Sequence, residues 1–177
     1  ANGKELWFCK AASGRGSPMP DFVDGRLHVV SGKPGETYAV KPGGRGDVTQ
    51  THKLWSTPRR AGRDLPSPAV VNGRMIVVSL SGKVTCYEAA TGEVQWEDKL
   101  GVKGEFAAAP LIVDNHILVQ NAYAGETLVL KPGDQLEIVR RNTLGAEVDE
   151  MFRAALVPAR GRIYARSLST LYCIGAR

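Results

Sequence analysis

The stretch from Pro68 to Trp96 constrains the fold more than any other part of the chain, because it contains a complete hairpin pattern followed by two more strand patterns. Two apolar runs, 69–71 and 75–78, flank Asn72-Gly73, a residue pair suited to a two-residue primed hairpin turn. Runs this short and this rich in β-branched residues predict paired, buried strands and not helices. Two further turn-and-strand units follow, at 81–87 and 91–96.

The hairpin of this stretch recurs along the chain. Its four turns are Asp24-Gly25, Asn72-Gly73, Asp114-Asn115 and Arg160-Gly161, and their second residues are separated by 48, 42 and 46 positions. Four short strands in a period of roughly 40 to 50 residues are typical of a propeller blade. The sequence therefore predicts an all-β fold, a β-propeller of four-stranded antiparallel blades with four repeats in a single domain over residues 1–177.

The ends of the chain do not match each other in strand number. The blade repeats are expected at about 17–56, 66–100, 106–141 and 152–176, and residues 2–9 carry the pattern of an outermost blade strand. The last repeat lacks such a strand, and an unpaired blade edge exposes backbone N–H and C=O groups. We therefore expect residues 2–9 to close the ring. Three arrangements satisfy this: four blades closing within one chain by pairing 2–9 with 171–174, a homodimer completing an eight-bladed ring, or a longer propeller of which this chain is a part.

Charge and hydropathy exclude two classes of partner. The net charge is +5, but the arginines and lysines stand mostly at turns or alternate with apolar residues. A basic stripe interleaved with aromatic residues is missing, so we predict no nucleic-acid partner. No window of about 18 apolar residues exists, so we also predict no membrane span.

Cysteine and histidine spacing predicts neither a disulfide nor a metal site. The cysteines, Cys9, Cys86 and Cys173, contain no C-x-x-C pair. Cys86 and Cys173 fall in the same alignment column as Ala39 and Val129, so we expect both to pack between blades as small apolar residues. His28, His52 and His116 are each expected in a strand and are not spaced as metal ligands.

The complete repeat in 68–96, P-x-V-V-[DN]-G-R followed by a T-G-x-x-x-W segment, resembles the PQQ-like (pyrroloquinoline-quinone-like) β-propeller repeat. The resemblance extends over essentially the whole chain in four copies. In that family the tryptophan of each blade docks between neighbouring blades and packs on the turn region of the next repeat. The resemblance assigns this structural role to Trp7, Trp55 and Trp96, with Ile138 in place of tryptophan in the third copy.

The PQQ-like family does not fix one function, because it includes quinoprotein dehydrogenases, the periplasmic lipoprotein of outer-membrane β-barrel assembly, and sensor domains of kinases. By resemblance, an active dehydrogenase holds its quinone between a tryptophan and a disulfide of adjacent cysteines, beside a Ca²⁺ ion. This sequence has no Cys-Cys pair, and Asp21 is the only acidic residue in the expected innermost strands. Ca²⁺ takes at least six oxygen ligands. The nearby group Glu147, Asp149 and Glu150 is interpreted as a solvated turn.

The sequence thus favours a non-enzymatic scaffold or a protein- or peptide-binding module without a cofactor. A portion of a PQQ-dependent dehydrogenase is the alternative. The resemblance alone implies a periplasmic or otherwise extracytoplasmic location.

A partner surface is expected on one face of the propeller. The loops between consecutive blades and the turns between second and third strands emerge there, and they vary more among repeats than the strands do. Its basic residues, Arg59, Arg60, Arg63 and Arg153, are predicted to dock a protein or peptide partner. The alternatives are that the first three belong to a solubilising loop and that Arg153 lines a wet central channel.

Overall fold

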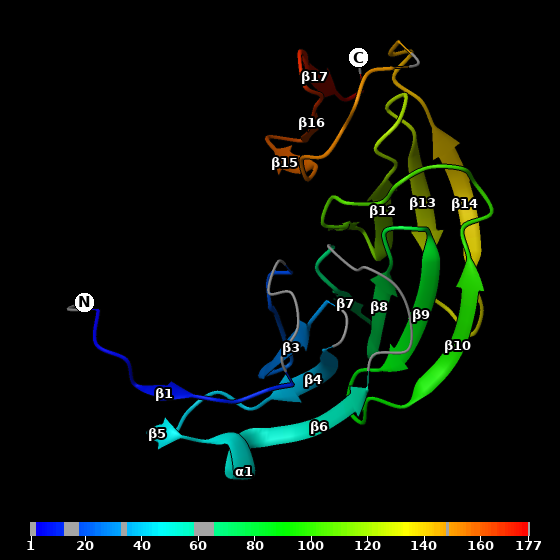
Figure 1. Cartoon of the computed structure of the whole chain (residues 1–177). Coiled ribbons are helices and arrows are strands. Elements are labelled where there is room, and N and C mark those ends of the chain that lie inside the picture. Colours follow the sequence, from blue (N-terminus) through cyan, green and yellow to red (C-terminus); the bar gives the residue numbers. More distant parts are fainter. Residues whose placement is uncertain (1–2, 13–17, 33–34, 59–65, 148, 177) are drawn as a thin grey trace.

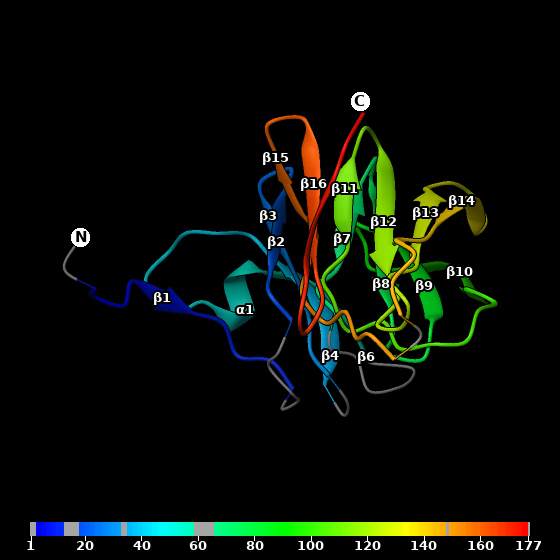
Figure 2. The same ribbon diagram turned by 90° about the horizontal axis from the view of Figure 1, so that it is seen from above.

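In a computed structural model the chain forms an open arc of β-sheets that stand side by side (Figure 1). Three of these sheets have four strands and one has three, and these four are antiparallel; a further sheet is a parallel pair of two strands. The structure describes residues 3–12, 18–32, 35–58, 66–147 and 149–176. Seen from above, the sheets are stacked like the blades of a propeller (Figure 2). The predicted all-β blade architecture is therefore confirmed, in the form of an arc that is open between its ends.

Each sheet is one blade, built from consecutive strands. Blade 1 contains β2 (Asp21–Val23), β3 (Arg26–Val30), β4 (Glu36–Val40) and β6 (Lys53–Pro58). Blade 2 contains β7 (Ala69–Val71), β8 (Arg74–Val78), β9 (Lys83–Glu88) and β10 (Val94–Lys99). Blade 3 contains β11 (Leu111–Val113), β12 (His116–Gln120), β13 (Thr127–Lys131) and β14 (Glu137–Asn142). Blade 4 contains β15 (Val157–Ala159), β16 (Arg162–Arg166) and β17 (Leu171–Ile174).

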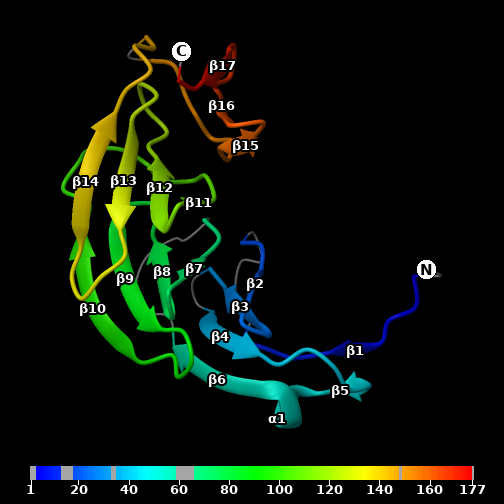
Figure 3. The same cartoon turned by 180° about the vertical axis from the view of Figure 1, so that it is seen from behind.

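The hairpin turns that marked the repeat determine where each blade begins. Asp24, Asn72 and Arg160 have φ angles of 50°, 52° and 51°, and the glycine after each is also left-handed. A two-residue primed turn requires positive φ at both central positions, and it matches the twist of the two strands it joins. The short first strand of every blade lies on the inside of the arc, and the long fourth strands β6, β10 and β14 lie on the outside (Figure 3).

The core consists of layers between blades, because strand residues alternate between the two faces of each blade. Ala69 and Val71 on β7 pack in the layer shared with blade 3, whereas Val70 packs in the layer shared with blade 1. Blade 2 is therefore covered on both faces, which explains why its strands read as continuous apolar runs.

The N-terminal strand is the main departure from expectation. β1 (Trp7–Phe8) pairs in parallel with β5 (Gly46–Asp47), beside blade 1, and not with β17. The expected closure of residues 2–9 on 171–174 is therefore not formed, and the two ends of the arc lie apart (Figure 1). The physical reason is that β5 offers a nearer partner: the Gly46 and Val48 N–H groups donate to the carbonyls of Leu6 and Phe8 at 3.0 and 2.9 Å.

His52 also differs from its expected place. It ends α1 (Thr49–His52), a single turn that connects β5 to β6, and does not lie in a strand. His28 and His116 lie in β3 and β12 as expected. Within the described residues, no helix has the length and apolarity needed to cross a membrane.

A chain of backbone hydrogen bonds links successive blades at the ends of their second strands. Phe106 donates to the Leu80 carbonyl of blade 2 at 2.9 Å, and Ala122 of blade 3 donates to Glu105 at 2.7 Å. The pattern repeats one blade further, where Phe152 donates to Ala122 and Leu168 donates to Met151, at 2.8 and 3.0 Å. The loops between blades are thereby held against the turns between second and third strands, and we refer to this surface as the loop face.

Candidate binding cleft and the blade joints

Two tryptophans lie at the joints between blades. The Trp55 indole of blade 1 donates from Nε1 to the Ala89 carbonyl of blade 2 at 3.1 Å, and its ring covers Gly92. The Trp96 indole of blade 2 donates to the Gly133 carbonyl of blade 3 at 3.0 Å. Gly133 also accepts from Arg74 Nε at 2.9 Å, and Arg74 pairs with Asp134. Each joint thus places a side chain of one blade on the turn between the third and fourth strands of the next.

Trp7 lies opposite Gly46 in the β1–β5 pair, next to the corresponding turn of blade 1.

The third copy departs from the sequence alignment. In blades 1 and 2 the tryptophan lies opposite a residue of the third strand, Trp55 opposite Ala39 and Trp96 opposite Cys86. In blade 3 the equivalent third-strand residue is Val129, and Arg140 lies opposite it. Arg140 and not Ile138 therefore takes the tryptophan position. Ile138 instead packs in the layer shared with blade 2.

The predicted basic face is only partly described. Arg59, Arg60 and Arg63 lie outside the described residues. Arg153 pairs with Glu105 through an Nη2–Oε2 contact of 2.9 Å and remains about half exposed. Its charge is therefore already matched by a neighbour on the loop face.

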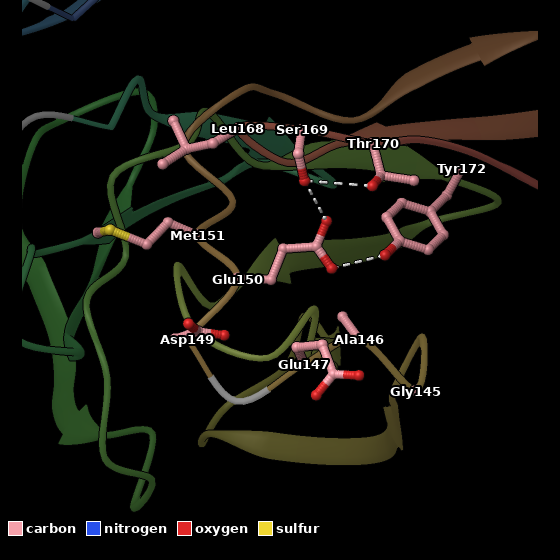
Figure 4. A pocket seen from close by; sticks show the side chains of 10 residues that line it. All are labelled: Gly145, Ala146, Glu147, Asp149, Glu150, Met151, Leu168, Ser169, Thr170 and Tyr172. Carbon is pink, nitrogen blue, oxygen red and sulfur yellow. Dashed lines mark hydrogen bonds between the residues drawn. The ribbon is translucent and has the colours of Figure 1, made fainter.

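One described recess on the loop face lies at blade 4. It has a volume of about 520 Å³ and is bounded by residues 145–147 and 149–151 on one side and by the turn and strand 168–172 on the other. Three carboxylates line it together with apolar and hydroxyl side chains (Figure 4). We call this recess the blade 4 cleft; its lining residues are Gly145, Ala146, Glu147, Asp149, Glu150, Met151, Leu168, Ser169, Thr170 and Tyr172.

Glu150 is the organising side chain of the blade 4 cleft. Its carboxylate accepts hydrogen bonds from the Ser167 hydroxyl, from Tyr172 Oη at 2.7 Å and from Ser169 Oγ at 3.4 Å. These bonds lower the pKa of Glu150, and the bond from Ser167 has the largest effect. The hydrogen bond to Glu150 in turn raises the pKa of Tyr172. Glu150 therefore stays ionised at neutral pH. The interpretation of Glu147, Asp149 and Glu150 as a plain solvated turn was incomplete, because Glu150 bonds to blade 4 through Ser167 and Tyr172.

Glu147 and Asp149 are exposed at the rim of the blade 4 cleft, and Leu168 beside them is 71% exposed. The cleft is thus a recess with an apolar edge and negative charge, on backbone that is fixed by the hydrogen bonds between blades. Such a surface suits an extended segment that carries cationic and apolar side chains. The sequence did not indicate the cleft, since its two walls are more than fifteen positions apart and belong to different repeat elements.

The residues present do not fit a quinone and calcium site. Cys9, Cys86 and Cys173 are separate thiols, and two of them lie in different blades. Among the described residues, no group of three or more His, Cys, Asp or Glu side chains is placed to hold a metal ion. Burial raises the pKa of the Cys86 thiol to about 11, as expected for a packed residue, whereas Cys173 is exposed and does not pack between blades as the sequence suggested.

Comparison with known proteins gives the family. A family model described as "Outer membrane protein assembly factor BamB" matches residues 36–140, more than half of the chain. The chain belongs to this family of PQQ-like β-propellers. No curated protein sequence matches the chain.

Solved structures show the same fold at low sequence identity. BamB from Moraxella catarrhalis aligns with a TM-score of 0.71 at 17% identity over 96% of this chain and 49% of its own. Quinohemoprotein alcohol dehydrogenase from Comamonas testosteroni aligns with a TM-score of 0.63 at 16% identity over 94% of this chain and 32% of its own. The computationally designed Ika4 protein aligns with a TM-score of 0.68 at 14% identity over 98% and 99% of the two chains. This PQQ-like chain therefore spans about half the length of that BamB.

Proposed function

We propose that this PQQ-like chain is a non-enzymatic protein-binding scaffold whose blade 4 cleft takes an extended peptide segment with cationic and apolar side chains. The observation that carries the proposal is the cleft itself, a recess of about 520 Å³ bordered by Glu147, Asp149 and the exposed Leu168. The basic face of Arg59, Arg60, Arg63 and Arg153 stays a separate prediction; of these residues the structure describes Arg153, which pairs with Glu105.

The contacts around the cleft support binding without reorganisation. Glu150 is fixed by its hydroxyl donors, and the segment directly after it is anchored by the backbone bonds from Phe152 to Ala122 and from Leu168 to Met151. A rigid recess loses less conformational entropy on binding than a loop that must first become ordered. Carboxylates at the rim act mainly on the choice of partner and on association rate.

The proposal is tested with two synthetic peptides, one alternating lysine and leucine and one alternating glutamate and leucine, each labelled for fluorescence anisotropy. We expect the lysine peptide to bind and the glutamate peptide not to bind. The double variant Glu147→Gln with Asp149→Asn should weaken lysine-peptide binding by about 2- to 30-fold, since each of the two exposed ion pairs contributes about 0.2–1 kcal/mol.

A matched control is the double variant Glu93→Gln with Glu137→Gln, which removes the same type of charge from exposed positions outside the cleft. It should leave the lysine-peptide affinity unchanged. Equal weakening by both double variants would reduce the effect to net charge and would rule out a cleft-specific site.

The alternative function, a portion of a quinoprotein dehydrogenase, makes a different prediction. A quinone that binds the folded chain with Ca²⁺ raises its stability by RT ln(1 + [L]/Kd), so Tm would rise with ligand concentration. Under the scaffold proposal, added quinone and Ca²⁺ leave Tm unchanged.

Two further proposals rest on the family. We propose an extracytoplasmic, periplasmic location, testable by cell fractionation. We also propose that further blades of the same repeat complete the ring, because the chain spans only about half of the BamB structure it matches.

A further inference from the structure

His28 on β3 is buried in the layer between blades 1 and 2. It lies two positions from Val30, so both side chains leave the same face of the strand, and Val30 packs with Val70 and Met75 of blade 2. His28 is 1% exposed. Both blades of this joint have four strands, so the environment of His28 is formed within the chain.

The position of His28 is apolar in the next two blades. Counted from the hairpin turns, its equivalents are Ile76 of blade 2 and Leu118 of blade 3, and Ile76 is 2% exposed. Nδ1 of His28 has no hydrogen-bond partner among the described residues. A buried polar atom without a partner costs free energy, so an aliphatic side chain would stabilise this joint more than the imidazole does. What the imidazole adds is a change of charge between about pH 5 and pH 8.

The groups of blade 1 around the ring act on its charge in both directions. Burial lowers the pKa of His28 from its ordinary value of 6.5. The Asp21 carboxylate opposes this and raises the pKa, Arg26 lowers it further, and Asp24 raises it. The third strand, β4, places the uncharged Ala39 opposite His28. The net result is a lowered pKa, so the ring is neutral at neutral pH.

Blade 2 presents titratable side chains of β9 and β10 to blade 1. Tyr87 is 2% exposed and packs in the layer that contains His28. Lys83 lies four positions before Tyr87 on the same face of β9 and pairs with Glu97 of β10 through an Nζ–Oε1 contact of 2.9 Å. Lys99 lies opposite Lys83 and is exposed. The Glu97 charge is thus matched by Lys83 within blade 2, which leaves Asp21 of blade 1 as the carboxylate that acts most on the ring.

Asp21 also links the innermost strands of the two blades. It lies opposite His28 in the β2–β3 pair, and its Oδ2 accepts from the Val70 N–H of β7 at 3.1 Å. Opposed side chains of an antiparallel pair have Cβ atoms about 4.5–5.5 Å apart, so the Asp21 carboxylate is placed to attract a charged imidazole. At the outer end of the joint Trp55 donates to Ala89, and its ring centroid lies 6.3 Å from that of His28. His28 therefore lies between the inner and the outer hydrogen bond of this joint.

We propose that protonation of His28 loosens the joint between blades 1 and 2. The neutral ring packs in the closed joint, whereas a charged ring in a buried apolar layer is costly unless it is paired. Asp21 is the available counter-ion, and by pairing with the charged ring it gives up the Val70 N–H. The proposal concerns a different pair of blades from the blade 4 cleft and does not depend on peptide binding there.

The response to pH has a defined direction. In an opened joint the ring is in water and has its ordinary pKa of about 6.5. In the closed joint burial lowers that pKa, so between the two values the open form binds a proton that the closed form does not. The closed joint is therefore fully stable above about pH 6.5 and loses stability as the pH falls towards the lowered pKa.

Hydrogen exchange followed by NMR at about pH 7.5 and about pH 5 tests the proposal, with rates expressed as protection factors so that the intrinsic pH dependence is removed. We expect the Val70 amide and the Trp55 indole N–H to lose about 3- to 30-fold in protection at the lower pH, since each unit of pKa difference is a factor of ten. The Phe106 amide and the Trp96 indole N–H, which bond across the next joint, should keep their protection.

Two variants separate the ring from its neighbour. His28→Ile copies Ile76 of the next blade, so the protection of this joint should no longer depend on pH. Asp21→Asn keeps an acceptor for the Val70 N–H and removes the charge that raises the pKa of His28. The NMR titration midpoint of His28 should therefore fall below its wild-type value in Asp21→Asn.

His116→Gln is the control variant. Nδ1 of His116 lies 2.9 Å from the Asp114 carbonyl oxygen in its own hairpin turn, so this variant should respond to pH like the wild type. Far-UV circular dichroism checks that each variant is folded, and the comparison of the two joints in the wild type needs no variant. Equal losses at both joints, a pH response retained by His28→Ile, or an unchanged His28 midpoint in Asp21→Asn would overturn the proposal.

Discussion

Gly92 shows how closely one residue of a blade is matched to its neighbour. Its φ is +76°, and a Cβ atom there would lie 2.3 Å from Cε3 of Trp55. We expect Gly92→Ala to destabilise the chain by about 2–5 kcal/mol, from left-handed backbone strain together with overpacking against the indole. Urea denaturation monitored by tryptophan fluorescence measures the change.

Gly73→Ala is the matched control for Gly92→Ala. Gly73 has a φ of +73°, but a Cβ atom there would meet only Glu88 Oε1, at 4.0 Å. The control should therefore show only the backbone strain, about 1–2 kcal/mol. Equal losses of stability would mean that the indole moves aside without penalty.

Asp47 gives a prediction on pH. Hydrogen bonds from the Thr49 side chain and backbone, with the Lys10 ammonium, lower the pKa of Asp47 to about 2. A carboxyl with a lowered pKa stabilises the folded state above its unfolded pKa near 3.9, and that contribution is lost as the pH falls towards 2. A carboxyl-carbon NMR titration should give a midpoint near 2, and Thr49→Val should raise it. A midpoint near 3.8 would contradict these contacts.

Residue roles were predictable where the residue type itself is rare. The sequence has three tryptophans, and Trp55 and Trp96 each stand alone in an expected fourth strand, so both were identified without an exact count of positions. Arg140 was missed because the turn between β13 and β14 is one residue longer than the turn between β9 and β10: the paired residues Leu130 and Ile138 are eight positions apart, whereas Tyr87 and Val94 are seven apart. A longer turn shifts every later position without changing the side-chain pattern of the strand, so the sequence alignment pointed to Ile138.

The segments between blades carry more of the stability than their irregular form suggests. Phe106 is fully buried, and its ring lies against Gly82, where an added Cβ would be 2.9 Å from Cε2. We expect Phe106→Ala to reduce the free energy of unfolding by about 3–5 kcal/mol, because it empties the space between a blade loop and the preceding turn. Thermal or urea unfolding tests this.

Tyr123→Ala is the control for Phe106→Ala. Tyr123 lies in the next turn of the same face but is 40% exposed. Its truncation should change stability by no more than about 0.5 kcal/mol. If the two variants were equally stable, the inter-blade loops would not be part of the core.

Strands were predictable as elements because hairpin turns with positive φ have a narrow residue preference, as at Asp24-Gly25 and Asn72-Gly73. The segment 43–52 gave no such signal. Gly43, Gly44 and Gly46 all have positive φ, and a glycine-rich run is compatible with many conformations. For that reason β5, α1 and the pairing of β1 with β5 were not foreseen.

At the scale of the molecule, the arc should not be uniformly stable. Blade 2 is covered on both faces, whereas blade 4 has one exposed face and a free β17 edge. We expect amides of β8 and β9 to exchange slowest and those of β16 and β17 fastest in hydrogen exchange measured on the isolated chain. Uniform protection across all blades would contradict this gradient.

The repeat predicted the number of blades but could not predict the shape that they make. Ring closure depends on whether β1 prefers β17 or β5, and this is a competition between two sets of backbone hydrogen bonds that side-chain patterns do not encode. The blade 4 cleft was unpredictable for a similar reason, since Glu150 and Tyr172 meet only after blade 4 has docked on the loop of residues 143–151.

The tryptophan joints have a consequence for how such chains grow in evolution. The Ala89–Gly92 turn of blade 2 contacts Trp55 of blade 1, and Trp96 of blade 2 contacts the corresponding turn of blade 3. A gene segment that encodes residues 66–100 therefore encodes both a turn on which a tryptophan docks and a tryptophan that docks on the turn of the next blade. Tandem duplication of that segment would insert a blade whose two new contacts are already compatible, so such chains can lengthen one blade at a time without compensating mutations.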